Sequence, residues 1–484
     1  MPRDDDSRYK WHVLGVVVFG IFMVVLDTTV VNVAFPTMRE QFHASLAESQ
    51  WIVSLYVLAL GITMPSTGFL ADRLGMKRMY LSGLGLFATG SLGSGFAPSL
   101  GVLVTTRALQ GVGGGIALPL GTAMLFAAFP PAEQGFALGL YGVALLAAPA
   151  LGPILGGFLV DHGLWRWIFF INVPIGATGV ALGSWLLREG RAEHETRADP
   201  LGLLTSIVGF GAMLYAAAIA DQAGWTGARV IVAFAVGIVG LAVFAAIELW
   251  VARDPLLDLR LFRNWTFLNA SLVGWVTVMA LFGAEFLLPI YLQMLRGRTA
   301  LQTGLILLPL AVAAGVTTPI AGWLYDRIGP RPLVTFGFVV LAVNTWQLSE
   351  LTEATSIRWI LVLMAMRGLA LGSTVQSTYA TALGTVKRKR VARGSSLINS
   401  MRFVVQSIAV AVLATIVASY RDDQVRGFEA AYRLTFWFSL LALALGALLP
   451  GWPGAWGGRE ALAKDAEAEG GGRAERGRRD VAAD

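Results

Sequence analysis

The chain has 484 residues, of which 56% are apolar and only 14% are charged, and its formal net charge is +6. A soluble domain of this size needs far more charge to cover its surface, so the composition predicts an all-α polytopic membrane protein. Cysteine is absent, which excludes disulfides, thiolate metal sites and a cysteine nucleophile. The four histidines are scattered, so no metal site or cofactor is expected. In a membrane protein, the basic surplus indicates topology rather than nucleic-acid binding.

A membrane-spanning helix needs roughly 20 apolar residues. We predict such helices at 11–35, 49–71, 78–96, 99–127, 135–160, 165–187, 201–221, 229–251, 266–294, 301–325, 332–350, 356–383, 395–419 and 430–450. If the N-terminus is inside, most Lys and Arg residues fall in cytoplasmic segments, which predicts that both termini are cytoplasmic. The basic run at 387–390 either anchors this topology or binds anionic lipid.

The first predicted helix carries a carboxylate, Asp27, within an apolar stretch. A charge inside a span costs about 2.5–3.5 kcal/mol on insertion scales, so Asp27 is expected to face the protein interior and to be functional. Burial disfavours the charged form, so the group could bind a proton from one side and release it to the other while a lipophilic cation competes for it. The alternative is a structural hydrogen bond to a neighbouring Thr or Asn. Asn32, further along, is a helix-packing residue or a cavity candidate.

A loop motif, Gly-x-Leu-x-Asp-Arg-x-Gly, occurs twice, 254 positions apart, from Gly68 and from Gly322. Its candidate gating residues are Gly68, Asp72, Arg73 and Gly75 in the first copy and Asp326 and Arg327 in the second. The glycines permit tight turning and close approach. The carboxylate can pair with a basic residue or with the positive end of a helix, while the basic residues also serve topology.

Two arginines lie within predicted spans, Arg107 in the fourth helix and Arg367 in the twelfth. They are 260 positions apart, nearly the same separation as the two copies of the loop motif. The repeated motif and the paired arginines therefore predict two six-helix repeats, at 1–190 and 263–450. Two further helices at 191–262 are inserted between them, and a disordered cytoplasmic tail follows at 451–484. Such repeats typically hold a substrate near the middle of the membrane and rock to alternate access. On the residues alone, Arg107 compensates a negative charge between helices.

In the second repeat, Glu285 is the only acidic residue deep within a span. It is either a second titrating or cation-binding group or a partner for Arg367 or Arg402. Glu248 and Asp221 lie near helix ends and are expected to be interfacial. Polar and aromatic side chains on helices bordering the cavity are candidates for substrate contact. These are Asn32, Tyr56, Gln110, Phe282, Phe286 and Arg367.

Five segments in order resemble the major facilitator superfamily, specifically its fourteen-helix drug:proton antiporter branch. They are Leu26–Pro36, Gly68–Arg78, Arg107–Gly115, Ala148–Gly157 and Trp165–Gly176. The resemblance implies that Arg107 takes part in proton transfer, with Gln110 in its network. It also implies that the Gly68–Arg78 loop is a cytoplasmic latch in which Arg73 forms an ion pair. Gly152, Pro153, Gly156 and Gly157 match a segment associated with antiporters, although close helix packing also explains the glycines.

The resemblance therefore implies a proton-driven exporter of hydrophobic, cationic compounds in the cytoplasmic (inner) membrane. It is expected to be a monomer and not an enzyme, and it would need a periplasmic adaptor only in a Gram-negative host. No Walker-type phosphate-binding motif is present in the sequence, so ATP is not expected to drive transport. One alternative keeps the fold but exports a single metabolite, antibiotic or lipid. The other is a non-pumping membrane sensor or scramblase.

Overall fold

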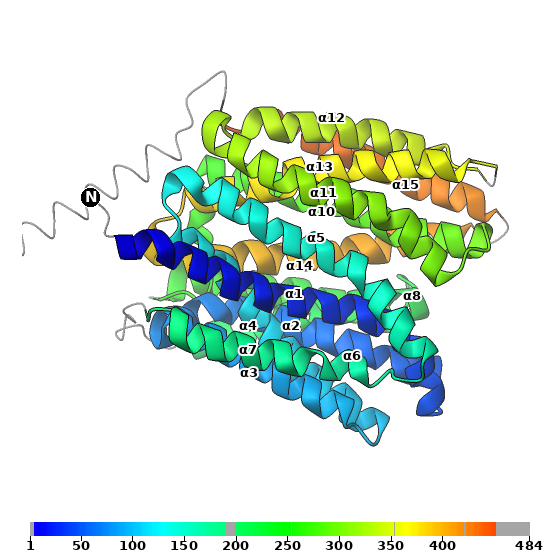
Figure 1. Cartoon of the computed structure of the whole chain (residues 1–484), viewed down its shortest axis with the longest axis horizontal. Helices are drawn as coiled ribbons and strands as arrows, with labels where there is room; N and C mark the ends of the chain where they lie inside the picture. Colours follow the sequence, from blue (N-terminus) through cyan, green and yellow to red (C-terminus); the bar gives the residue numbers. More distant parts are fainter. Residues whose placement is uncertain (1–3, 190–198, 253, 353, 421–422, 452–484) are drawn as a thin grey trace, which may run out of the picture.

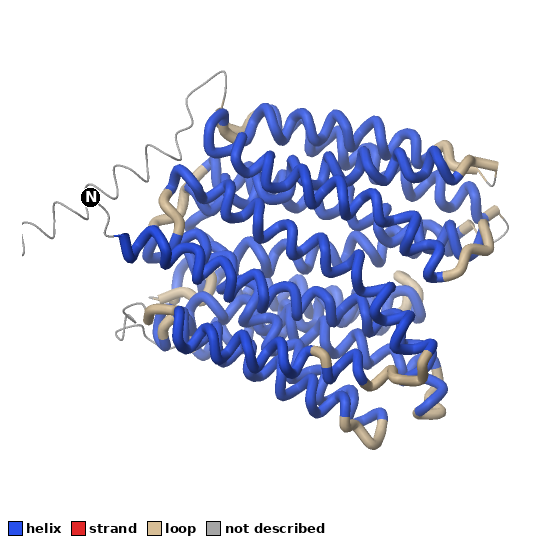
Figure 2. Tube along the Cα trace, in the orientation of Figure 1, coloured by secondary structure: helices blue, strands red, loops and turns tan. Residues whose placement is uncertain are grey.

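The computed structural model describes residues 4–189, 199–252, 254–352, 354–420 and 423–451, and in these it contains helices and no strands. The long helices lie side by side along one axis (Figure 1), and loops occur mainly at the two ends (Figure 2). The helices are α1 (Asp4–Gln41), α2 (Leu46–Leu74), α3 (Met76–Gly95), α4 (Leu100–Ala128), α5 (Gln134–Asp161), α6 (Trp167–Phe170), α7 (Asn172–Leu186), α8 (Pro200–Ala223), α9 (Ala228–Ala246), α10 (Trp265–Ile290), α11 (Ala300–Ile328), α12 (Pro330–Ser349), α13 (Ile357–Gly384), α14 (Val391–Ser419) and α15 (Gln424–Ala447).

The helices form two groups, an N-terminal group around α1 to α4 and α7 and a C-terminal group around α10 to α13 and α15 (Figure 1). Two helices join the groups: α5 packs against both α1 and α11, and α14 packs against both α2 and α10. The bundle therefore has a seam between the groups, which α5 and α14 cross.

The inserted helices α8 and α9 pack on each other, and α8 also contacts α2 and α14. Gly209 and Gly240 allow this pair to approach closely, since a Cβ on Gly209 would lie 2.8 Å from the backbone nitrogen of Leu241. Trp51 of α2 stacks on Tyr215 of α8 with ring centroids 6.1 Å apart. The pair is thus docked on the seam rather than separate from the bundle.

The two helices that lead into the copies of the loop motif, α2 and α11, share local structure at both ends. Ser45 with Glu48 forms a capping box at the start of α2, and Thr299 with Gln302 does the same at the start of α11, again 254 positions on. At the other ends, Gly75 and Gly329 adopt positive φ angles of 95° and 79°, which glycine tolerates without strain.

Twelve helices in the described part of the chain are long and apolar enough to cross a membrane. This confirms an all-helical, multi-span protein. The α3 helix is not among the twelve, and α10 contributes a shorter apolar stretch, Trp265–Leu281. The predicted span at 165–187 corresponds to the candidate span Trp167–Leu186, which is interrupted locally at Ile171, between α6 and α7. Pro174 cannot donate a hydrogen bond to the carbonyl of Phe170, which weakens the helix at this point. The predicted tail after Gly451 lies outside the described residues.

Candidate functional site

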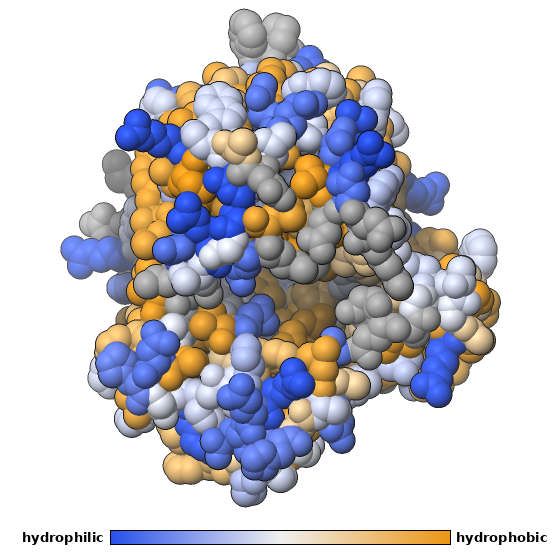
Figure 3. Space-filling view, turned by 90° about the vertical axis from the view of Figure 1, so that its right-hand side faces the viewer, coloured by the Kyte–Doolittle hydropathy of each residue, from blue (hydrophilic) through white to orange (hydrophobic). Residues whose placement is uncertain are grey.

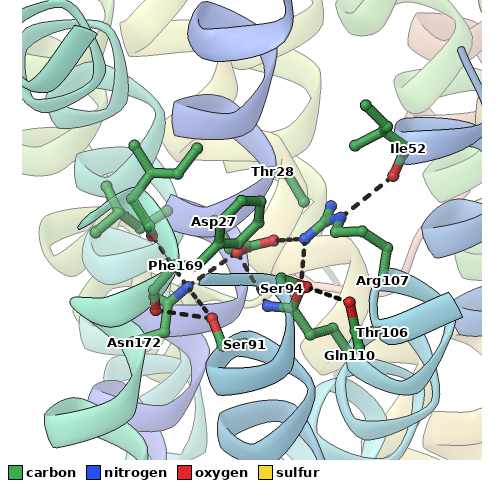
Figure 4. Close-up of polar contacts among 12 residues, drawn as sticks. Asp27, Thr28, Ile52, Ser91, Ser94, Thr106, Arg107, Gln110, Phe169 and Asn172 are labelled. Carbon is green, nitrogen blue, oxygen red and sulfur yellow. Dashed lines mark hydrogen bonds and ion pairs between the residues drawn. The ribbon is translucent and has the colours of Figure 1, made fainter. Parts of the chain in front are cut away.

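Asp27 lies at the centre of a buried hydrogen-bond network inside the N-terminal group (Figure 4). Its Oδ2 forms an ion pair with Nη1 of Arg107. Its Oδ1 accepts hydrogen bonds from Gln110 Nε2 at 3.2 Å and Asn172 Nδ2 at 2.9 Å. All four residues are at most 1% exposed. These donors match an ionised carboxylate, which only accepts hydrogen bonds.

A second layer of polar groups holds these side chains in place. Arg107 donates from Nε to the Ile52 carbonyl at 3.2 Å and from Nη1 to Gln110 Oε1 at 3.0 Å. Ser94 donates to the same Gln110 oxygen at 3.2 Å, and Asn172 Nδ2 lies 3.1 Å from the acceptor Ser91 Oγ. The network therefore joins five helices: α1, α2, α3, α4 and α7.

The guanidinium of Arg107 also stacks over the ring of Tyr56, with Cζ 4.1 Å from the ring centroid. Such cation–π contacts are stronger in desolvated surroundings than at exposed sites. The Tyr56 hydroxyl is buried and has no hydrogen-bond partner. Tyr56 and Gln110, both predicted as cavity residues, are enclosed within the helix packing, whereas Asn32 is exposed.

The glycines after Arg107 explain how the fourth helix comes this close to its neighbours. A Cβ on Gly111 would lie 2.3 Å from the Tyr56 carbonyl, and one on Gly113 would lie 2.5 Å from the Gly83 carbonyl. No larger residue fits at either position without a backbone shift. Close packing against α2 and α3 thus positions Arg107 and Gln110 beside Asp27.

The second predicted arginine, Arg367, is also buried, but it meets backbone carbonyls. Its Nη2 donates to Ala280 at 2.9 Å and to Leu281 at 2.7 Å, and its Nη1 donates to Asn344 Oδ1 at 3.2 Å. Arg367 therefore binds α10 about one turn before position 285. The side chains of Glu285, Phe282 and Phe286 lie outside the described residues, so the predicted roles of these three residues stay predictions.

At the end of the molecule where α2 and α11 terminate, Asp72 of the first loop motif binds across the seam. Its Oδ2 accepts a hydrogen bond from Arg393 Nε of α14 at 2.5 Å. Gly68 makes this contact possible, because a Cβ there would lie 2.7 Å from the Cα of Arg393. Arg73, expected as an ion-pair partner, is exposed.

Asp326 of the second motif binds a helix N-terminus instead. Its two oxygens accept hydrogen bonds from the backbone N–H groups of Gly135 and Phe136, each at 3.0 Å, at the start of α5. This is the favourable position for a carboxylate, because those N–H groups have no partner within the helix. Arg327 is exposed and stacks on Trp323, with Cζ 3.7 Å from the ring centroid.

A third set of contacts joins the two groups deeper inside the bundle. The Tyr379 hydroxyl of α13 lies 3.0 Å from Thr122 Oγ1 of α4, 2.7 Å from Ser395 Oγ and 2.6 Å from Asn399 Nδ2. Ser395 also donates to the Pro119 carbonyl at 2.7 Å. These hydroxyls satisfy one another, as buried polar groups require, and they hold α4 against α13 and α14.

Comparison with known proteins identifies the family. The family model of the Major Facilitator Superfamily matches residues 17–410 and 271–456. The chain belongs to the Major Facilitator Superfamily. It is 33% identical over 414 residues to an uncharacterized MFS-type transporter, YhcA, of Bacillus subtilis (strain 168), covering 86% of this chain and 78% of that protein. It is 34% identical over 405 residues to the multidrug resistance protein Stp of Mycobacterium tuberculosis (strain CDC 1551 / Oshkosh), covering 83% of this chain and 74% of Stp.

The major facilitator fold is also seen in solved structures. The proton:xylose symporter XylE aligns with a TM-score of 0.66 at 14% sequence identity, covering 92% of this chain and 97% of XylE. At that identity the likeness shows the fold alone. This chain is therefore a multi-pass major facilitator transporter, and its family consists of transporters rather than enzymes.

In this major facilitator protein, the end opposite the Asp72 and Asp326 contacts is hollowed between the two helix groups (Figure 3). At the end with the loop motifs, the cross-seam contacts described above join the two helix groups. The structure is therefore hollowed at one end and joined across the seam at the other, as an alternating-access transporter requires.

The candidate antiporter segment of this major facilitator chain lies on α5 against α1. A Cβ on Gly152 would lie 2.1 Å from Thr29 Oγ1, and one on Gly156 would lie 3.0 Å from Val33 Cβ. Gly157 has open space around it, and the side chain of Pro153 is outside the described residues. Gly152 and Gly156 thus serve close packing against the stretch of α1 that lies within about two turns after Asp27.

The site has no features of a metal centre, since no group of three or more His, Cys, Asp or Glu residues in the described part of the chain could hold an ion. Sequence analysis found Asp27, Arg107 and Gln110 but missed Asn172, Ser91 and Arg393. Asn172 lies within the Trp165–Gly176 segment used for the family resemblance, so its position was available as a signal. Arg393 lies near the start of a helix, where a basic residue is readily explained by membrane topology.

Proposed function

We propose that this transporter is a proton-driven antiporter that exports hydrophobic, cationic compounds across the cytoplasmic membrane. The observation that carries the proposal is the buried pair of Asp27 and Arg107, closed off from solvent between α1 and α4. Ionisable residues within spans are costly and mark proton or substrate pathways. The similarity to a protein named for multidrug resistance supports drug-like substrates.

In the proposed cycle, Asp27 takes up a proton while the protein is open to the outside. The neutral carboxyl no longer balances the charge of Arg107, and one of the donors on Asp27 loses its acceptor. The network among α1, α4 and α7 must then rearrange, which gives protonation a mechanical consequence for the N-terminal group. An inward proton releases about 2.3 kcal/mol per 100 mV of membrane potential, in addition to the pH term.

We further propose fourteen crossings with both termini in the cytoplasm. The α3 helix is 20 residues long and packs along α4 and α7, and α10 is 26 residues long and packs against α13, α14 and α15. Both helices therefore lie within the bundle, as the twelve candidate spans do. With this topology the Asp72 and Asp326 contacts lie on the cytoplasmic side, and the structure faces outward.

The test is ethidium transport in inverted membrane vesicles with an imposed proton gradient. We expect the native protein to accumulate ethidium and Asp27→Asn to lose at least nine-tenths of that activity. Asp161→Asn, which changes an exposed carboxylate at the end of α5, should retain native transport. Native-level transport by Asp27→Asn would contradict proton coupling at this residue.

The substrate range separates the proposal from a dedicated exporter. A panel of lipophilic cations of different shape should compete with ethidium in the same vesicles. If ethidium and the panel cations are not accumulated, while a proton gradient still drives transport of a single metabolite, antibiotic or lipid, the dedicated exporter is supported. Absence of any gradient-driven transport would favour a non-pumping protein.

A further inference from the structure

Glu248 lies in the final turn of the inserted pair, where α9 ends in a π-helical turn, Ile247–Val251. Its position near a helix end predicts an interfacial side chain, and at this end of the helix the structure buries Glu248 within the protein, with 1% of it exposed. The linker after α9 folds over it, and Glu248 Oε1 accepts a hydrogen bond from the Leu256 backbone N–H at 3.2 Å. Its other oxygen, Oε2, is buried and has no hydrogen-bond partner.

A second carboxyl group, that of Asp199, lies beside it. Asp199 caps the N-terminus of α8, and its Oδ1 accepts a hydrogen bond from the Gly202 N–H at 2.8 Å. Its Oδ2 is likewise buried without a partner. A Cβ on Gly202 would lie 2.2 Å from Asp199 Oδ2 and 2.9 Å from Glu248 Oε1, so the two carboxyl groups are immediate neighbours across this glycine.

Asp199 is half-buried and Glu248 is buried, so ionising both carboxyl groups is costly, since each loses hydration and each repels the other. A single proton resolves both problems. A protonated Glu248 Oε2 is a donor, and the unpartnered Asp199 Oδ2 is an acceptor. One O–H···O hydrogen bond would then satisfy both orphaned oxygens.

A short series of contacts connects this pair to the closed end of the transporter. Leu256, whose N–H binds Glu248, follows Pro255, whose carbonyl accepts a hydrogen bond from Arg393 Nη1 at 3.1 Å. The same guanidinium holds Asp72 through Nε at 2.5 Å. The carboxyl pair and Asp72 therefore lie on either side of one cation.

We propose that Asp199 and Glu248 form a proton-binding site at the base of the inserted helices, and that its proton controls the Asp72–Arg393 contact. With the proton bound, Arg393 keeps its ion pair with Asp72 and the inner end stays closed. When the proton leaves, two negative charges draw Arg393 toward the linker and weaken its hold on Asp72. The two inserted helices would thus couple cytoplasmic pH to the opening of the inner gate.

Other charged groups near the pair are engaged in contacts of their own. Asp258 accepts a hydrogen bond from Arg390 at 2.7 Å, and Arg260 donates to the Leu249 carbonyl at 3.4 Å. In the described part of the chain, the charged groups on the elements around Glu248 include Asp72, Arg73, Asp199, Asp254, Asp258, Arg260, Arg263, Arg390 and Arg393. Among these, Asp199 is the one whose carboxyl group lies beside Gly202 together with that of Glu248.

The absence of native cysteine allows a direct test by paired spin labels. Labels at Leu74→Cys and Lys389→Cys, both exposed and at the same end of the two helix groups, would report gate opening in nanodiscs. We expect the longer-distance population of the native protein to rise as pH increases from 5 to 9. Glu248→Gln, whose amide can still donate to Asp199, should stay at the low-pH distribution and lose most of this response.

Asp199→Asn is the second variant, since asparagine also caps helices well, and it should likewise lose most of the response. Glu189→Gln changes a carboxylate at the same end, in a surface contact with Arg78 at 3.3 Å, and should follow the native curve. The proposal is overturned if both Glu248→Gln and Asp199→Asn follow the native curve, or if Glu189→Gln changes the curve as much as they do.

The inference rests on the proposed role of Asp72 and Arg393 as the inner gate, but not on proton coupling at Asp27. Repeating the distance measurement in an Asp27→Asn background separates the two ideas. We expect the Glu248-dependent part of the pH response to persist there, even though transport is lost. If Asp27→Asn removes the whole response, the site at Glu248 does not act on the gate, whatever the transport assay shows.

Discussion

Replacing Arg107 with methionine tests whether the buried ion pair holds the N-terminal group together. Methionine keeps a long apolar side chain but removes the ion pair with Asp27, the hydrogen bond to the Ile52 carbonyl and the stacking on Tyr56. Removing one partner of a buried pair costs about 3–5 kcal/mol, because the other charge stays buried and unbalanced. For a unit of 150–250 residues each kcal/mol shifts the unfolding midpoint by about 2–4 °C, so we expect a fall of about 6–20 °C.

The measurement is thermal unfolding in detergent, followed by tryptophan fluorescence and completed as a double-mutant cycle. Asp27→Leu alone should also destabilise, since it leaves Arg107 buried without its anion. The double variant Asp27→Leu/Arg107→Met should recover most of the loss, because an apolar pair of suitable volume replaces a buried ion pair at little cost. Arg433→Met removes an exposed pair with Glu429 and should change stability by at most about 0.5 kcal/mol. If the two single losses simply add in the double variant, the pair has no coupling and the reasoning is refuted.

Two further predictions concern the seam. Gly322→Val should abolish the monodisperse peak in size-exclusion chromatography, because a Cβ there would lie 2.3 Å from the Gly135 carbonyl, whereas Gly315→Val, with open space around it, should elute as native. Tyr379→Phe removes the hydroxyl that lies 3.0 Å from Thr122, and at about 1 kcal/mol per hydrogen bond it should shift the spin-label populations about fivefold toward the inner-open state. An unchanged distribution would show that this hydroxyl cluster does not hold the inner end closed.

The centre of the N-terminal group could be predicted from sequence because buried charges constrain their surroundings strongly. Asp27 and Arg107 are expensive within apolar helices, so each needs a partner, and the structure brings them together. Asn172 was missed because an uncharged polar side chain in a span can satisfy its hydrogen bonds in many ways at little cost in free energy, for example with the backbone of its own helix. Its role depends on α7 packing beside α1, which no local pattern specifies.

Contacts across the seam were harder to predict for a related reason. Asp72 and Arg393 are 321 positions apart in the sequence, and a basic residue near a helix end already has an explanation in membrane topology. The burial of Glu248 was not predicted, because its position at a helix end says nothing about the linker that covers it. In both cases the missing information is how a segment distant in sequence folds over the residue.

The two copies of the loop motif bind across the seam at the same end of the transporter by different chemistry. Asp326 accepts hydrogen bonds from two backbone N–H groups at the start of α5, and these donors are fixed to their helix. Asp72 accepts from the guanidinium of Arg393, a flexible cation that also reaches the Pro255 carbonyl. A backbone donor cannot be drawn away by a nearby carboxylate, but a guanidinium can exchange one anion for another. Of the two contacts, the one at Asp72 is therefore the one that a change in local charge can switch, and the unpaired Glu248 and Asp199 oxygens lie on that side.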